Sequence, residues 1–158
     1  MERLFYEAAV FFIYFWKMKI TVPLQIIELE DDNYHLVISS VLPDGNQGLW
    51  VVDTGASKTV FDKTLSENFS TDNQGTEEVH TAGIGENPIE TETGRLQSFL
   101  LGKMKVENLR VALLDLSHIN TFYSKATNLK ICGLIGSDFL LKHQATIDYK
   151  KKLLRLKL

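Results

Sequence analysis

The sequence predicts a mainly β protein, and three observations support this fold class. Apolar residues run without interruption over residues 49–52, which is typical of a short strand that is buried on both faces. Near the end of the chain, Leu154, Leu156 and Leu158 alternate with charged residues, the pattern of a strand with one buried face. Turn-forming residues separate similar short segments along most of the chain.

The composition is that of a single globular domain. The chain has 158 residues, of which 44% are hydrophobic and 23% are charged, and a chain of this size can bury one core. Its formal net charge of −3 argues against nucleic acid as a partner, because non-specific binding to phosphates requires basic patches.

The cysteine and histidine residues predict neither a disulfide nor a metal site. Cys132 is the only cysteine, which excludes an internal disulfide, and its apolar neighbours indicate a buried thiol. The four histidines, His35, His80, His118 and His143, show none of the spacings of known metal-binding motifs. We therefore expect no metal and no other cofactor.

The first residues form an apolar N-terminal extension. Residues 4–16 are almost wholly apolar and aromatic, but they are fewer than the about 20 that a membrane-spanning helix needs. The start is not basic, and no small-residue cleavage site follows, as a signal peptide would require. We favour an extension over residues 1–17 and a domain over residues 18–158, with Met18 as an alternative start. We expect a cytoplasmic protein; the alternative is membrane anchoring through residues 4–16.

Strands are expected throughout residues 18–158. Turn-prone sequences, such as residues 30–33 and 42–46, separate apolar or alternating segments. We expect strand segments at residues 20–29, 34–42, 49–52, 59–61, 105–116, 145–148 and 153–158, and a long hairpin over residues 77–101.

Helices are expected to be few and short. Residues 62–69 are consistent with a helical turn, and residues 117–128 are polar and irregular, so both a loop and a short helix remain open there. Ser137 is suited to cap a short C-terminal helix that contains the apolar residues 139–141. Just before it, Gly136 would allow two backbones to approach closely.

Asp53 is the candidate functional residue, because it directly follows the buried strand over residues 49–52. Strand interiors disfavour aspartate, so we expect Asp53 where the strand ends and Gly55 allows a tight turn. Thr54 and Ser57 offer hydroxyl groups within local reach. A carboxylate at a buried strand end is unfavourable unless it is hydrogen-bonded, paired or used in chemistry. The alternative is an Asx-type turn that only closes the strand.

The sequence Asp-Thr-Gly-Ala-Ser that begins at Asp53 resembles the active-site loop of the aspartic proteases. At this chain length it resembles the single-domain, retropepsin-like branch of that family. Residues 133–141 are similar to the second signature of the family, in which two apolar residues and a glycine, here Gly136, precede a helix. The chain departs from the retroviral members at Ser137, where they usually have an arginine that helps to brace the dimer.

A third segment agrees with the resemblance in order and spacing. Gly83, Ile84 and Gly85 lie about 30 residues after Asp53, where the family has the flap that folds over the substrate. Two glycines around an apolar residue allow close contact with a bound backbone. An ordinary β-turn would also explain them, and the Gly-x-Gly pattern alone is weak evidence.

The resemblance implies a closed-barrel-like acid-protease fold with one short C-terminal helix and a flap hairpin. It also implies an aspartic endopeptidase that cleaves a polypeptide substrate as a homodimer, because the chemistry uses two carboxylates and each chain supplies one Asp53. The residues it implies for catalysis are Asp53, Thr54 and Gly55, and those for substrate binding are Ala56, Ser57, Gly83, Ile84 and Gly85.

The sequence is compatible with two rival interpretations. A non-catalytic peptide-binding or dimerisation domain could have the same fold, but such a domain has no physical need for an intact Asp-Thr-Gly sequence. Asp62, Lys63 and Thr64 resemble the phosphorylated sequence of ion-pumping ATPases, which continues with Gly-Thr, whereas this chain continues with Leu-Ser. The protease remains the preferred interpretation.

Overall fold

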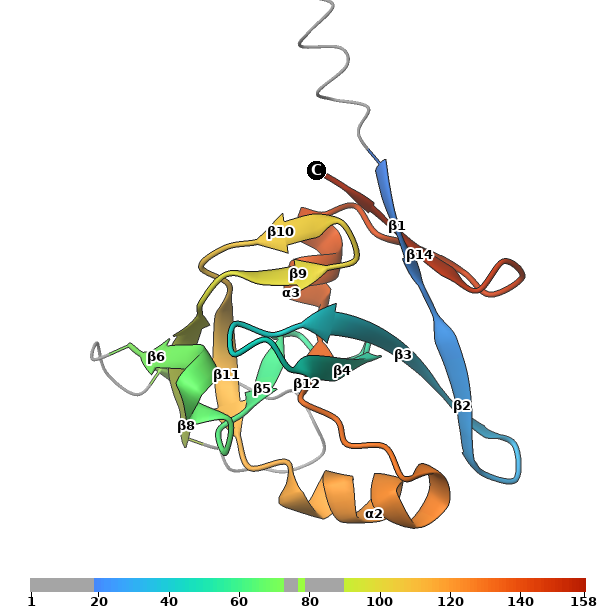
Figure 1. The fold of residues 1–158 in the computed structure, drawn as a ribbon, viewed down its shortest axis with the longest axis horizontal. Coiled ribbons are helices and arrows are strands. Elements are labelled where there is room, and N and C mark those ends of the chain that lie inside the picture. Colours follow the sequence, from blue (N-terminus) through green and yellow to red (C-terminus); the bar gives the residue numbers. More distant parts are fainter. Residues whose placement is uncertain (1–18, 73–76, 79–89) are drawn as a thin grey trace, which may run out of the picture.

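The computed structural model describes residues 19–72, 77–78 and 90–158 (Figure 1). The apolar extension over residues 1–17 and the expected flap residues Gly83, Ile84 and Gly85 lie outside these ranges. The described part consists mainly of strands, which confirms the predicted mainly β fold class.

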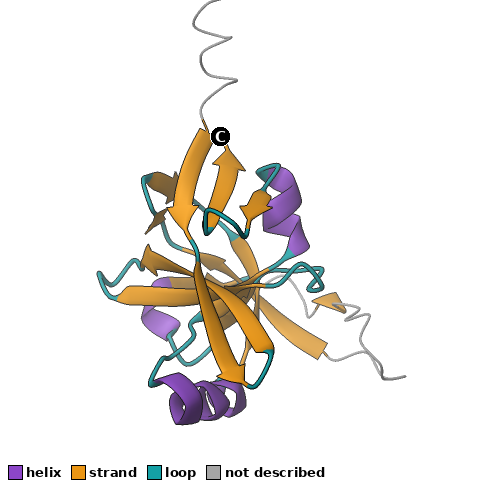
Figure 2. Ribbon diagram, turned by 90° about the vertical axis from the view of Figure 1, so that its right-hand side faces the viewer, coloured by secondary structure: helices purple, strands orange, loops and turns teal. Residues whose placement is uncertain are grey.

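The larger of two sheets contains most of the described strands and curls into half a barrel (Figure 2). In spatial order its strands are β10 (Met104–Val106), β9 (Phe99–Leu101), β3 (Asn33–Val41), β4 (Gln47–Val52), β12 (Gly133–Ile135), β5 (Val60–Asp62), β11 (Arg110–Leu114), β8 (Glu90–Leu96) and β6 (Phe69–Thr71). In addition, β2 (Gln25–Glu30) pairs with β3, and β7 (Glu77–Glu78) pairs with β8.

The smaller sheet joins the first and last strands of the described chain. Its order is β1 (Lys19–Pro23), β14 (Leu153–Lys157) and β13 (Thr146–Asp148), and both pairings are antiparallel. Leu154 and Leu156 are buried, so the alternating pattern correctly predicted the inner face of β14.

The structure corrects the expectation of one strand over residues 20–29. The segment divides at Leu24 into β1 and β2, which belong to different sheets. Pro23 has no N–H group to donate to a neighbouring strand. The N–H group of Leu24 donates instead to the carbonyl oxygen of Lys152, at 2.9 Å. Proline therefore ends β1 where the chain changes sheets.

The hairpin expected over residues 77–101 is confirmed only in part. β7 and β8 pair in antiparallel fashion, with Glu78 opposite Glu90. β9 does not continue β8, because it pairs with β10 on one side and with β3 on the other.

α2 (Ser117–Thr127) is an 11-residue helix, which decides between the two alternatives that the sequence left open. Its one buried residue is Tyr123, so its sequence has little apolar periodicity. It ends at Asn128, whose φ of 57° is the left-handed conformation common after helix ends.

The remaining helices are short, as expected. The predicted C-terminal helix is α3 (Ser137–Lys142). The helical turn expected over residues 62–69 is limited to the 3-10 helix η1 (Ser66–Asn68), since its flanks belong to β5 and β6. None of the described helices is long and apolar enough to cross a membrane.

Trp50 is the centre of the main core. Its ring packs between Phe61 and Phe99, with ring centroids 5.4 and 5.7 Å away. Its indole N–H donates to the Ser40 hydroxyl at 2.8 Å, so the one polar atom of this buried ring is satisfied. This packing fixes β4, the strand that leads into Asp53.

Candidate active site

Asp53 lies at the point where two parallel strands end. β4 and β12 pair with Val52 opposite Ile135, and the Asp53 N–H donates to the Ile135 carbonyl at 3.0 Å. Asp53 is half-buried. Its Oδ1 accepts the N–H groups of Gly55 at 2.9 Å and Ala56 at 3.2 Å, which is the Asx-type turn that the sequence left as the alternative. The donors are backbone groups and not the hydroxyl groups of Thr54 and Ser57.

The second carboxylate oxygen of Asp53 remains available for chemistry. Oδ2 has no hydrogen-bond partner within residues 19–72, 77–78 and 90–158. One oxygen therefore holds the loop, while the other can receive a water molecule, a substrate or a second carboxylate.

The start of α3 is fastened to the Asp53 loop, and here one expectation was wrong. Ser137 does not cap the helix: the N-cap residue is Gly136, and no side chain makes a capping bond. The Ser137 hydroxyl donates instead to the Thr54 carbonyl at 2.9 Å, and its N–H donates to the Ala56 carbonyl at 2.8 Å. Ser137 thus positions the loop.

Asp138 and Thr59 form a second brace, which the sequence analysis did not identify. Asp138 Oδ1 accepts the Thr59 N–H at 2.9 Å, the Thr59 hydroxyl at 2.7 Å and the Phe139 N–H at 2.8 Å. The Thr59 oxygen in turn accepts the Gly136 N–H at 3.1 Å. The one local sign of this brace in the sequence was Asp138 itself, a short polar residue near the start of a predicted helix.

Gly136 has the role that the sequence predicted. A Cβ atom at this position would lie 2.5 Å from the carbonyl carbon and oxygen of Lys58, closer than atoms can approach. The segment after Asp53 and the segment before α3 can therefore pack together only because residue 136 has no side chain.

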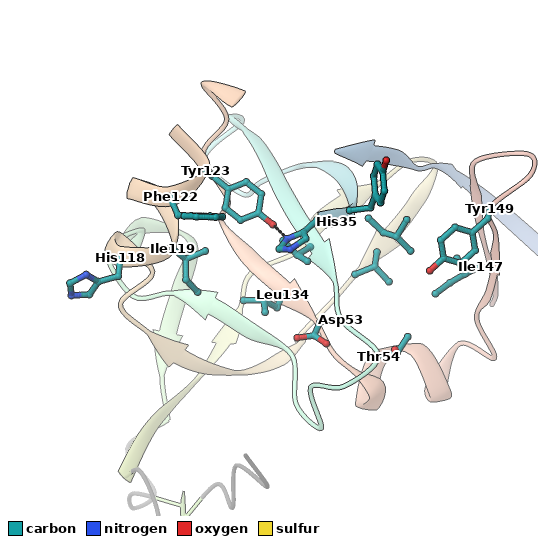
Figure 3. A pocket seen from close by; sticks show the side chains of 14 residues that line it. His35, Asp53, Thr54, His118, Ile119, Phe122, Tyr123, Leu134, Ile147 and Tyr149 are labelled. Atoms are coloured by element: carbon teal, nitrogen blue, oxygen red, sulfur yellow. Dashed lines mark hydrogen bonds between the residues drawn. The ribbon is translucent and has the colours of Figure 1, made fainter. Parts of the chain in front are cut away.

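A pocket of about 670 Å³ opens beside Asp53 and Thr54 (Figure 3). Most of its wall is apolar or aromatic, and it includes Ile119, Phe122, Leu134, Ile147 and Tyr149. Apolar walls with a few polar groups are typical of ligand-binding sites. The geometry therefore combines a carboxylate with an available oxygen and a cavity large enough for several side chains of a peptide.

α2 forms one side of this pocket, which no local sequence pattern indicated. Ile119 and Phe122 of this helix face the cavity and are partly exposed. From the same helix, Tyr123 forms a hydrogen bond with Nδ1 of His35 on β3, and both line the pocket (Figure 3). These two residues are 88 positions apart in the chain, so only the tertiary fold shows that they meet.

The structure brings together the predicted residues of the Asp53 loop. Thr54, Gly55 and Ser57 are exposed at its crest, and Ala56 is half-buried. The roles predicted for Gly83, Ile84 and Gly85 remain predictions, because these residues lie outside the described ranges.

Solved structures that are similar to this chain include two proteins described as retropepsin-like or retroviral protease-like. The retroviral protease-like domain of Ddi1 from Leishmania major is 20% identical, covers 77% of this chain and 87% of that domain, and has a TM-score of 0.50. A retropepsin-like aspartic protease from Rickettsia conorii is 21% identical, with coverage of 88% and 90% and a TM-score of 0.49. The comparison with curated proteins gave no match.

The likeness to the Leishmania domain confirms the retropepsin-like fold. A family model described as aspartyl protease matches residues 40–139, which is well over half of the chain. The matched segment contains the Asp53 loop, β12 and the start of α3. The chain therefore belongs to the aspartyl protease family.

Proposed function

We propose that the protein is an aspartic endopeptidase in which two Asp53 carboxylates, one from each of two identical chains, activate a water molecule. The observation that carries this proposal is that the two carboxylate oxygens of Asp53 have different surroundings. Gly55 and Ala56 hold Oδ1, while Oδ2 has no partner in the described part of the chain and the residue borders the large pocket.

The dimer follows from the number of carboxylates that the reaction needs. The sequence contains a single Asp-Thr-Gly, and a two-fold contact would bring two copies of the loop together without any second gene copy. Thr54, Gly55 and Ser57 are exposed at the crest of the loop. Among the described strands, β13 forms an edge of the small sheet, and Ile147 of this strand lines the same pocket as Thr54.

In the proposed mechanism the two carboxylates share one proton. Aspartic proteases are a standard example of this behaviour, which we apply here on the basis of family membership. The ionised Asp53 takes a proton from the water, and the protonated Asp53 of the second chain polarises the scissile carbonyl and then supports protonation of the leaving amine. The apparent pKa values belong to the pair and not to either residue.

The proposed substrate is a polypeptide in an extended conformation. The pocket beside Asp53 has apolar walls on α2 and β12, which can hold side chains next to the scissile bond. Ala56 and Ser57 lie beside Thr54 on the loop, where a peptide backbone would pass. Gly83, Ile84 and Gly85 would pair with that backbone from the other side.

The test is a peptidase assay against a peptide library from about pH 3 to about pH 7, a range in which a carboxylate pair can hold one proton. We expect cleavage by the parent protein and none by the Asp53→Asn protein prepared in parallel. A folded parent that binds library peptides but cleaves none would contradict the peptidase and indicate a non-catalytic peptide-binding domain.

A further inference from the structure

His35 lies on β3 and lines the same pocket as Asp53 (Figure 3). β3 and β4 pair as far as Val37 opposite Val51. Beyond this point Asp53 follows the end of β4, and its N–H group donates to Ile135 of β12. The imidazole and the proposed reaction centre therefore share one cavity.

The hydrogen bond with Tyr123 favours one tautomer of a neutral His35. Tyr123 is 2% exposed, its ring packs edge-on against the imidazole, and its hydroxyl forms a hydrogen bond with Nδ1. Burial raises the pKa of Tyr123 to about 12, so the hydroxyl keeps its proton. A buried O–H group needs an acceptor. Because Nδ1 is the acceptor that the structure provides, a neutral His35 carries its proton on Nε2.

The Nε2–H group is left without a partner among the described residues. No residue of the described part of the chain accepts a hydrogen bond from it, and much of the surrounding wall is apolar. Water can satisfy this donor in the empty pocket. A bound ligand that displaces the water must supply an acceptor, or the buried donor is left unsatisfied. Asp53 supplies an acceptor group in the same pocket, so the two residues offer complementary polar contacts to a ligand.

We propose that the Nε2–H group of His35 donates a hydrogen bond to a carbonyl oxygen of the bound polypeptide, and that Tyr123 is the positioning residue that fixes this donor. The proposal rests on the proposed peptide-binding function of the pocket. It assigns a polar subsite to the wall formed by β3 and α2, next to the apolar surface that Ile119 and Phe122 provide. Either a backbone carbonyl or a side-chain amide or carboxylate could supply the oxygen.

The first test compares His35→Leu, which removes the donor, with His35→Gln, which retains an N–H donor of similar reach. On the best peptide from the library, His35→Leu should lower kcat/KM about three- to tenfold, mainly through KM. The logarithm of kcat/KM for His35→Gln should lie at least halfway from the value for His35→Leu to the value for the parent. Equal activity of His35→Leu and the parent, or equal losses in both variants, would overturn the proposal.

Substituted peptides identify the accepting oxygen. Replacement of each backbone amide by a thioamide, and of each carbonyl-bearing side chain by an apolar one, removes one good acceptor at a time. The peptide without the relevant acceptor should be cleaved equally by the parent and by His35→Leu. If His35→Leu weakens cleavage of every substituted peptide by the same factor, the residue has a structural role and the proposal fails.

A third measurement separates this proposal from the peptidase itself. In the Asp53→Asn protein, which we expect not to cleave, peptide binding should weaken when His35→Leu is added and should largely persist when His35→Gln is added. Nitrogen NMR of His35 should show the Nε2–H form in the parent and a mixture of both forms in Tyr123→Phe. Protonation of the neutral imidazole on Nδ1 in the parent, or equal peptide binding with and without His35→Leu in the Asp53→Asn protein, would overturn the proposal even if the protein is a peptidase.

Discussion

At the scale of single residues, the two oxygens of Asp53 have different surroundings. Oδ1 accepts hydrogen bonds from the N–H groups of Gly55 and Ala56, and Oδ2 has no partner among the residues that the structure describes. The sequence predicted the tight turn at Gly55, because the turn is local, but it indicated the hydroxyl groups of Thr54 and Ser57 and not these backbone N–H groups as donors. The rest of the site comes from β12 and α3, about 80 residues later, and required the family resemblance.

The Asp53→Asn substitution should abolish peptidase activity and leave the fold nearly unchanged. The amide oxygen can accept the same two backbone hydrogen bonds, but the amide cannot take a proton from water. We expect turnover below the detection limit and a Tm within a few degrees of the parent value, measured by peptide cleavage and thermal unfolding. Cleavage by the variant at the parent rate would contradict the role of Asp53.

Thr59→Val should destabilise the protein by about 2 kcal/mol, because it leaves polar partners of a buried hydroxyl unsatisfied. That hydroxyl donates to Asp138 and accepts the Gly136 N–H, and Thr59 is buried. Denaturant unfolding measures the change. The matched control is Thr121→Val, which removes an exposed hydroxyl that bonds within α2 and should change stability by less than about 0.5 kcal/mol. Similar effects of both variants would contradict the brace.

At the scale of elements, sequence patterns succeeded where the determining contacts are local. The alternation in β14 and the apolar run of β4 identified buried strands, since each pattern records the faces of its own strand. The break at Pro23 was missed, because apolar residues continue across it and only the sheet topology separates β1 from β2. α2 was left undecided because Tyr123 alone is buried. The pocket wall on α2 could not be predicted for the same reason.

Phe122→Ala should lower kcat/KM by about tenfold on peptides with a large apolar side chain beside the scissile bond, and should change stability little. Phe122 lines the pocket and is 42% exposed, so its ring is available to the substrate, and loss of its contact surface is equivalent to about 1–2 kcal/mol of binding. Leu100→Ala is the control, because Leu100 is 44% exposed on β9 and does not line the pocket. Steady-state kinetics with both variants tests whether Phe122 contacts the substrate. Equal losses of kcat/KM in both variants would contradict this contact.

At the scale of the whole molecule, the small sheet closes the domain. β1 pairs with β14 over five residues, and Val22 and Leu154 are both buried in the main core cluster. The first and last strands are therefore part of one folding unit. We propose that this unit begins near Met18, and a change in the starting residue tests that boundary.

A chain that starts at Met18 should fold and retain peptidase activity, because every described strand and helix follows it. A chain that starts at Gln25 lacks β1 and should lose stability, since Val22 would no longer cover Leu154. Thermal unfolding and peptide cleavage compare both with the full chain. Insolubility or lost activity of the Met18 chain would show that residues 1–17 belong to the working domain.

The active species should be a symmetric dimer with the two Asp53 residues facing each other across its axis. A lone Asp53 could hold a water molecule but would lack the protonated partner that polarises the scissile carbonyl.

Activity per chain should therefore fall steeply when the protein is diluted below the Kd of the dimer. A ninefold excess of Asp53→Asn chains should leave only about a tenth of the parent chains in active pairs, because the two chains mix at random in a two-fold contact. Cleavage assays on diluted and mixed samples, with sedimentation at the same concentrations, measure both effects. Full activity per chain at a concentration where sedimentation shows only monomers would contradict the dimer. The second carboxylate would then have to come from another residue of the same chain.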